Sequence, residues 1–216
     1  MAKFCPLFSS STGNSIYIGG GDDSILIDAG MTAKQLEQSL FGIGVDADSI
    51  RNIFITHEHS DHVKGLKVFT KKHKARVFMT QGTYEALVKT DAIDNVDECR
   101  IINDDGIDIG CMLIKPFAIS HDCNEPCGYT VEMANGRKLS VATDLGIMTD
   151  TVFDALKGSD LVTLEFFLGH LSRENNLPTL AYQTSVCALT MAGAEEGSDY
   201  YIRVAKPVWD ERALIL

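Results

Sequence analysis

The sequence lacks any apolar run long enough to span a bilayer, and it lacks the short apolar segment of a secretory signal peptide. Its first residues, Met1 to Phe4, lead directly into strand-like sequence. Both absences argue against an integral membrane protein and against a secreted one. We therefore expect a cytoplasmic protein with no membrane partner.

Cysteines with the spacing of a disulfide framework or a structural zinc site are also missing. Cys123 and Cys127 form the only close pair, and no second pair completes a set of four ligands. A disulfide-built domain would be short and dense in cysteine. We expect reduced, buried thiols at all six positions, which are Cys5, Cys99, Cys111, Cys123, Cys127 and Cys187.

Basic residues are in the minority, with 19 Lys and Arg against 30 Asp and Glu and a formal net charge of −11. This deficit argues against a protein that binds nucleic acid with its whole surface, although it leaves room for a local basic strip. The chain has 216 residues, of which 45% are hydrophobic. It can bury one substantial core, and we expect a single domain over residues 1–216.

Strand-like and helix-like segments are mixed along the chain. Thr32 is a plausible cap for a helix, and Asn135-Gly136 predicts a hairpin with a type I′ turn. Further helices are expected at about 62–73, 83–90 and 178–193, and strands at 3–8, 15–19, 24–28, 51–56, 76–79, 99–102, 112–119, 127–133 and 137–143. Antiparallel hairpins combined with strand–helix alternation favour an α+β (α/β) fold, a four-layer αββα sandwich.

Histidine is scarce, yet three of the six histidines lie in one segment, Thr-His-Glu-His-Ser-Asp-His at 56–62, directly after an apolar strand. His57 and His59 are two residues apart, so at the end of a strand they can point toward one metal ion. Asp61 and His62 fall where the chain turns into the next helix, which suits a second ion nearby. Imidazole and carboxylate are common metal ligands, and the cluster predicts a metal site.

The pattern His-X-His-X-Asp-His after a strand resembles the metallo-β-lactamase superfamily. In that superfamily a His, an Asp and a His follow, each at a strand end, and this chain offers His121, Asp144 and His170 in that order. The resemblance implies a sandwich of the metallo-β-lactamase type with two metal ions. It implies that the first ion is held by His57, His59 and His121, that the second is held by Asp61, His62 and His170, and that Asp144 bridges them.

Two such ions can share a hydroxide and activate it for hydrolysis. Their mixed ligands suit Zn²⁺ or Mn²⁺, and Fe²⁺ also accepts them. Asp61 is expected to be both a ligand and the catalytic residue that orients the hydroxide. Asp28 resembles the carboxylate with which the family supports its ligands, although a capping or turn role explains it equally well. The remaining histidine, His73, is expected to be solvated within a lysine-rich run.

Several longer segments resemble the WalJ (YycJ) family, namely 8–15, 26–30, 120–122, 125–129 and 170–176. Members of that bacterial family are regarded as 5′-to-3′ DNA exonucleases linked to mismatch repair. The resemblance therefore implies a hydrolase that cleaves phosphodiester bonds in DNA during repair, with DNA as its partner. Two alternatives stay open: a hydrolase of a small cyclic phosphodiester, lactone or thioester, and a non-catalytic metal-binding regulatory protein.

Two features favour a phosphate-bearing substrate. Six basic residues and no acidic one lie between Lys64 and Arg76, and Lys64 and Lys67 are the nearest to the predicted site. Ser10, Ser11 and Asn14 could offer hydroxyl and amide groups to a phosphate. A solvated helix face is the preferred explanation of the lysines, and a polar hairpin turn is the preferred explanation of residues 9–15.

One junction departs from the family. Strand-like residues 160–165 run directly into strand-like residues 166–170, although parallel neighbours need a long crossover. The WalJ family carries tens of residues at this point, including a second Gly-His-Leu-Ser element. We expect that a segment is missing between Glu165 and Phe166, and with it a candidate general acid.

Overall fold

The computed structural model describes residues 2–166, 178–191, 193–198, 200–202, 208 and 213–216. The chain forms two units, Met1–Phe167 with Pro207–Leu216 and Leu168–Lys206. The second unit contains helix α6 (Pro178–Met191), close to the helix expected at 178–193. The first unit contains both sheets, and the single-domain interpretation stays a prediction.

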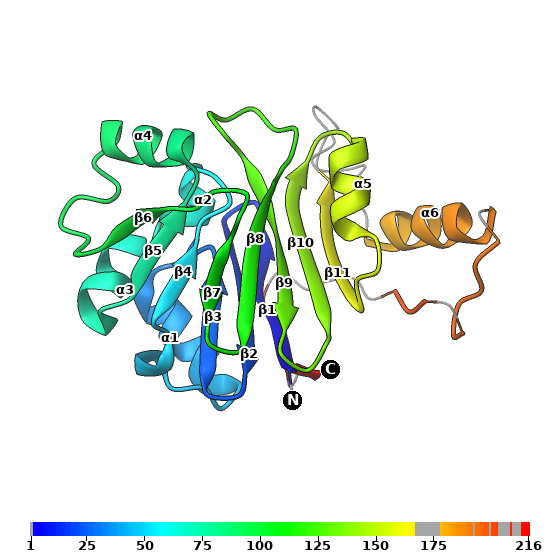
Figure 1. Cartoon of the computed structure of the whole chain (residues 1–216), viewed down its shortest axis with the longest axis horizontal. Coiled ribbons are helices and arrows are strands. Elements are labelled where there is room, and N and C mark those ends of the chain that lie inside the picture. Colours follow the sequence, from blue (N-terminus) through cyan, green and yellow to red (C-terminus); the bar gives the residue numbers. More distant parts are fainter. Residues whose placement is uncertain (1, 167–177, 192, 199, 203–207, 209–212) are drawn as a thin grey trace. The chain divides into compact units, whose positions relative to one another are not determined.

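A seven-stranded sheet has the order β12-β1-β2-β3-β4-β5-β6 (Figure 1). Strands β1 to β3 pair antiparallel, and β3 to β6 pair in parallel. The strands are β1 (Ala2–Ser10), β2 (Gly13–Gly20), β3 (Asp23–Ile27), β4 (Asn52–Phe54), β5 (Arg76–Met79), β6 (Cys99–Ile101) and β12 (Leu214–Ile215).

A five-stranded sheet has the order β11-β10-β9-β8-β7 and consists of β7 (Ile107–Ile109), β8 (Met112–Ala118), β9 (Cys127–Met133), β10 (Lys138–Leu145) and β11 (Leu161–Phe166). The predicted hairpin joins β9 to β10, but its turn type differs from the expectation. Among the turn residues only Gly136 has a positive φ, 83°, and its N–H donates to the carbonyl of Met133. A type I turn followed by a left-handed glycine gives this pattern.

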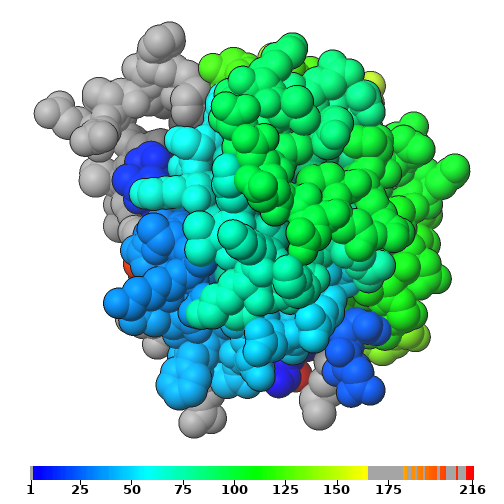
Figure 2. Space-filling view, turned by 90° about the vertical axis from the view of Figure 1, so that its left-hand side faces the viewer, coloured from blue at the N-terminus to red at the C-terminus, as the bar shows by residue number. Residues whose placement is uncertain are grey.

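Helices cover the outer faces of both sheets. Helices α1 (Ala33–Gly42), α3 (Leu66–His73) and α4 (Gln81–Lys89) lie on the seven-stranded side, the face turned toward the viewer in Figure 2. Helix α5 (Asp150–Leu156) lies beside the five-stranded sheet (Figure 1) and packs against β8. Two shorter helices, η1 (Ala47–Ser49) and α2 (Ser60–Val63), complete the first unit.

The strands at the centre of the first sheet are buried on both faces. In β3, Leu26 packs with the helices, whereas its neighbours Ile25 and Ile27 pack between the sheets. The same alternation places Phe54 and Phe78 between the sheets, where their rings stack 4.8 Å apart. Three apolar layers therefore lie between four layers of secondary structure, in the order helix, sheet, sheet and helix. This confirms the four-layer sandwich.

The helix expected at 62–73 is in fact two helices. Helix α2 ends at Val63 and α3 begins at Leu66, with Gly65 between them. The N–H of Gly65 donates to the carbonyl of Ala29, and a methyl group at Gly65 would lie 2.1 Å from the carbonyl oxygen of Met31. Packing of this junction against another backbone segment interrupts the helix.

The expectation for His73 was wrong. Its side chain is buried, Nδ1 lies 2.5 Å from Asp48, and Nε2 lies 3.1 Å from Glu37. His73 therefore ties α3 to α1 and η1. By contrast the cap at Thr32 is confirmed, because its hydroxyl accepts from the N–H of Gln35.

All six cysteines are free thiols, as expected, but only Cys5 and Cys127 are buried. Cys187 is exposed, and the other three are partly buried. No helix among the described residues is long and apolar enough to cross a membrane.

Candidate metal centre

The motif at 57–62 begins at the end of β4, in the middle of the parallel strands. Ile55 continues the strand by donating its N–H to Phe78, and α2 begins at Ser60. His57 and His62 are fully buried. The short distance between the end of the strand and the start of the helix explains how ligands from one six-residue segment can approach a common centre from two directions.

Three histidines predicted to bind the first ion do lie together. One ring nitrogen from each of His57, His59 and His121 falls within 4.8 Å of the others. His121 comes from the loop after β8, and its Nε2 lies 3.3 Å from Nδ1 of His59. Their ring centroids are 4.7 to 5.0 Å apart and nearly perpendicular. Imidazole nitrogens from two distant segments therefore converge on one point.

A second group shares His57 with the first. Asp144, at the end of β10, places Oδ2 2.8 Å from Nε2 of His62 and 3.6 Å from Nε2 of His57. These three ligand atoms also lie within 4.8 Å of one another. Asp61 lies at the edge of this group, with Oδ2 3.6 Å from Nε2 of His62. Asp144 is thus next to ligands assigned to both ions, as a bridging role requires.

Asp28 fixes the orientation of the buried histidines. Its Oδ1 accepts the backbone N–H of Thr56, and its Oδ2 accepts the hydroxyl of Thr56 at 2.8 Å. The same Oδ2 lies 2.8 Å from Nδ1 of His62. The hydroxyl of Thr56 is also 3.0 Å from Nδ1 of His57. In both rings Nδ1 is therefore the donor, and Nε2 is left to face the site.

The electrostatics of these two histidines differ. Burial lowers the pKa of His57 to about 2, and the neighbouring positive charge of His62 adds to the effect. Burial also opposes charge on His62, but the Asp28 carboxylate and hydrogen bonds to Asp144 and Asp28 outweigh it and raise its pKa to about 10. Without metal, His62 carries the proton and His57 stays neutral.

The backbone is strained at two of the carboxylates. Asp28 has φ 63° and Asp144 has φ 53°, in the left-handed region that few residues other than glycine adopt. Strain of this kind persists where the surrounding structure imposes it, and it gathers at functional sites. Asp28 follows β3 and Asp144 is the penultimate residue of β10, so in both sheets the strained positions lie at strand ends that carry the ligands.

The donor set fits the binding of divalent metal. Nε2 of His57 is buried and forms no hydrogen bond with any residue that the structure describes, although an unpaired buried nitrogen is costly. The first group would hold one ion through imidazoles, and His62 with Asp61 would hold part of the other, with Asp144 between them. Imidazole with carboxylate suits Zn²⁺ and Mn²⁺. His170 lies outside the described residues.

The loop that carries His121 is held at two further points, which sequence reasoning missed. Glu58, between the two motif histidines, accepts the N–H of Asn124 at 2.8 Å. Glu125 accepts the N–H of Gly82 at the start of α4 at 2.6 Å. Both carboxylates lie in segments that the sequence singled out, but their partners Asn124 and Gly82 are distant or unremarkable in sequence, so only the fold reveals these contacts.

Asn14 has a different role from the one expected. It is buried, and its Nδ2 lies 3.2 Å from Oδ2 of Asp61 and 3.1 Å from Nε2 of His62. It therefore supports ligands, whereas a substrate contact would need an accessible amide. Ser11 and Lys64 are exposed near the site, and Lys67 is exposed on α3. The hydroxyl of Ser10 is engaged by Thr12 and the carbonyl of Gly13.

Residues 23–195 match the model of the beta-lactamase superfamily domain. The chain is 32% identical over 163 residues to exodeoxyribonuclease YycJ of Bacillus anthracis, covering 75% of this chain and 61% of that protein. It is 26% identical over 255 positions to exodeoxyribonuclease WalJ of Streptococcus pneumoniae, covering 95% and 94%. A solved structure of human tRNase Z, short form, is similar with TM-score 0.57 and 18% identity, covering 75% and 76%.

The WalJ alignment is longer than this chain, so that relative contains residues that this chain lacks. Strand β11 includes both Glu165 and Phe166, and the chain passes through this point as one strand. That the family's segment belongs here stays a prediction. The family model covers most of the chain. The chain's possible ligand groups lie at the strand ends described above. The chain belongs to the beta-lactamase superfamily.

Proposed function

We propose that this chain is a dinuclear metal-dependent phosphodiesterase that acts on DNA as a 5′-to-3′ exonuclease. Two observations carry the proposal: two possible ligand groups share His57 beside Asp144, and relatives from Bacillus anthracis and Streptococcus pneumoniae are named exodeoxyribonucleases. The chain spans 61% of the first of these relatives, so the activity of the whole relative comes to this chain only as a proposal.

When bound, two divalent ions supply Lewis-acid polarisation of phosphoryl oxygens and a nucleophile at neutral pH. The chain's own residues prepare the site for this chemistry. Asp28 and Thr56 keep Nε2 of His57 and of His62 directed inward. Asn14 donates to Oδ2 of Asp61, which leaves Oδ1 outside this hydrogen bond. Asp61 would orient the attacking oxygen by accepting its proton.

Exposed groups beside the site supply the proposed substrate contacts. Among the residues suggested by the sequence, Ser11, Lys64 and Lys67 are exposed, and they would contact the phosphate backbone. Such contacts bind nucleic acid without reading its sequence. We also propose a role in DNA repair and a cytoplasmic location, both of which would be consistent with an exodeoxyribonuclease like those relatives.

The test is a direct comparison of substrates. Metal-loaded protein, with Mn²⁺ or Zn²⁺, is incubated with 5′-phosphorylated duplex DNA, a cyclic phosphodiester and a lactone. We expect shortening of the DNA from its 5′ end, and loss of that activity in Asp61→Asn. Asp105→Asn, an exposed loop carboxylate, is the matched control. Hydrolysis of the lactone or cyclic diester without DNA cleavage would reject the proposal.

A non-catalytic role makes the opposite prediction. Protein that binds two ions per chain but hydrolyses none of the three substrates would support it. Elemental analysis of protein purified without added metal identifies the ions in the same preparation.

A further inference from the structure

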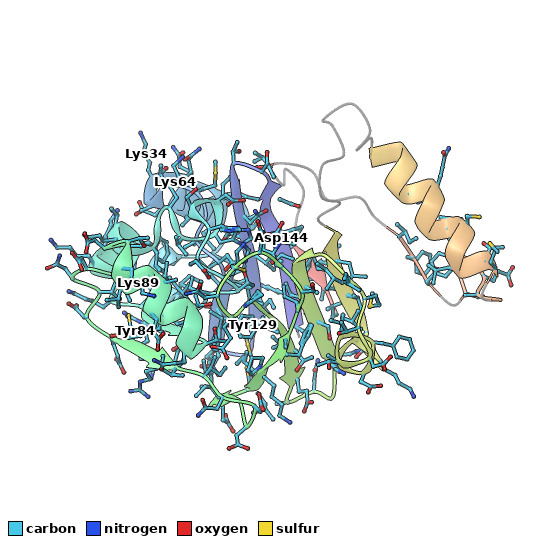
Figure 3. All side chains as sticks on the ribbon, turned by 90° about the horizontal axis from the view of Figure 1, so that it is seen from above. Lys34, Lys64, Tyr84, Lys89, Tyr129 and Asp144 are labelled. Carbon is cyan, nitrogen blue, oxygen red and sulfur yellow. The ribbon has the colours of Figure 1, made fainter. Side chains whose placement is uncertain are left out.

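A second lysine, Lys34, lies beside Lys64 at the metal-site edge of the first unit. Lys34 is in the first turn of α1, and Lys64 follows α2. Both are exposed, and Figure 3 shows the two labelled side chains at the same edge. Lys34 stands alone in the sequence, far from the lysine-rich run, so only the fold brings the two together.

Backbone packing establishes this proximity. A methyl group at Gly65 would lie 3.2 Å from the backbone nitrogen of Ala33, so the segments that carry Lys64 and Lys34 adjoin. Further along the same helices, Glu37 of α1 lies 2.8 Å from Lys72 of α3. Lys34 precedes Glu37 by three residues and shares its face of α1. Lys34 therefore faces α3 at the end nearer to Lys64.

Lys64 also lies on the same side as the site. It is three residues after Asp61, its backbone is helical, and its N–H donates to the carbonyl of Ser60. Residues three apart share a helix face, so Lys64 and Asp61 point to the same side, one turn apart. The ammonium group can therefore reach the surface next to the catalytic carboxylate.

Hydroxyl groups border these lysines. The turn between β1 and β2 packs on Met31, because a methyl group at Gly13 would lie 2.2 Å from the sulfur of that residue. Met31 in turn contacts the backbone at Gly65. Ser11 and Thr12 of the turn are exposed. We call the set of Ser11, Thr12, Lys34 and Lys64 the Lys34–Lys64 surface.

At the other end of α3 the lysines are paired with carboxylates. There Lys72 pairs with Glu37 at 2.8 Å, and Lys74 pairs with Asp97 at 2.9 Å. Two adjoining ammonium groups repel each other, and an anion between them relieves that repulsion. Phosphate also accepts hydrogen bonds from hydroxyl groups. In a chain of net charge −11, this is a specific place for an anionic group.

We propose that the Lys34–Lys64 surface binds the backbone phosphate next to the one that is cleaved. This inference rests on the proposed function and names how the substrate strand is held. Binding at this surface depends on charge and is independent of base sequence.

The test compares two double variants of the metal-loaded full chain, Lys34→Ala with Lys64→Ala, and Lys72→Ala with Lys74→Ala as a charge-matched control. Their substrates are a 5′-phosphorylated single-stranded oligonucleotide and bis(4-nitrophenyl) phosphate, which has a single phosphate. We expect the first variant to raise KM for the oligonucleotide at least tenfold more than KM for the small diester. Oligonucleotide binding by this variant should also depend less on salt. The slope of log affinity against log salt concentration should become shallower by about 1.4, because two phosphate contacts are lost. The control should match the wild type.

Equal KM changes for both substrates, or a control that behaves like the first variant, would overturn the inference. If the wild type cleaves the small diester but neither this oligonucleotide nor 5′-phosphorylated duplex DNA, the proposed function fails, and the oligonucleotide is then used as an inhibitor of that reaction. A weaker inhibition constant in the first variant alone still supports the surface. An oligonucleotide that neither reacts nor inhibits rejects it.

Discussion

Oδ2 of Asp28 lies 2.8 Å from Nδ1 of His62, and the buried Asp28 carboxylate lies behind this buried, predicted ligand. This pair fixes the orientation of the His62 ring and keeps the imidazole protonated in the metal-free protein. The carboxylate therefore acts on the site without facing it. Carboxylate–imidazole pairs of this kind typically change metal affinity by about 10- to 100-fold when they are disrupted.

Asp28→Asn should weaken metal binding by about that factor while the fold is kept, because Asn also tolerates a positive φ. The carboxylate raises the pKa of His62 to about 10, against the effect of burial, so metal binding must displace a proton at neutral pH. Wild-type affinity should therefore rise with pH, and the variant should release fewer protons. Calorimetry in buffers of different ionisation enthalpy measures both. Equal proton release would contradict the assignment.

Glu58→Ala should loosen the loop that carries His121, because the N–H of Asn124 loses its acceptor. We expect metal affinity to fall by about 10- to 100-fold. Glu58→Gln keeps an acceptor oxygen and should restore most of the affinity. Titration with Co²⁺, followed by its absorption spectrum, reports on the ligand field directly. Glu85→Ala, which removes an exposed carboxylate of α4, should leave the spectrum unchanged. If the Gln variant is as weak as the Ala variant, charge matters more than the hydrogen bond.

Gly30→Ala should destabilise the fold strongly. An added methyl group would lie 1.6 Å from the carbonyl oxygen of Asp61 and 2.5 Å from the backbone nitrogen of Asn14. Overpacking against rigid backbone costs about 3 kcal/mol or more. Gly42→Ala, at the exposed end of α1 with nothing within 4 Å, should instead add up to about 1 kcal/mol. Urea unfolding of both variants checks the contrast, and similar stabilities would show that Asp61 can move away.

His73→Phe should lower stability at neutral pH more than at acidic pH. Hydrogen bonds from Lys72 and His73 lower the pKa of Glu37, and the hydrogen bond from His73 lowers that of Asp48. Carboxylates with lowered pKa stabilise the fold above their ordinary values, near pH 4, and lose this effect as the pH falls through the lowered values. Denaturant unfolding at pH 7 and pH 3 measures the difference. A deficit that stays constant between the two would contradict the pairing.

Much of the site could be predicted because its ligands are chemically unusual and closely spaced. His57, His59 and His62 lie within one short segment, and the order of the later ligands along the chain completed the pattern. The buried strands were recognisable from their continuous apolar residues, since parallel strands between two layers are covered on both faces.

The supporting residues could not be predicted in the same way. Asn14 is far from Asp61 in sequence, and its polar surroundings resemble an ordinary turn. His73 lies among lysines that are exposed, yet its own position on α3 faces α1. Lys34 has no basic neighbours in sequence. In each case the partner comes from another element, and local pattern contains no information about it.

Strand β4 has consequences for how the site takes up its ions. Its side chains are anchored alternately in the layer beneath the helices and in the layer between the sheets. The segment that leaves it enters the ligand motif at once. Because β4 is held on both faces, the part of the site that it carries should have its shape before the ions bind. Binding there requires the exchange of a proton for a cation, and little ordering of β4 and residues 57–62 accompanies it.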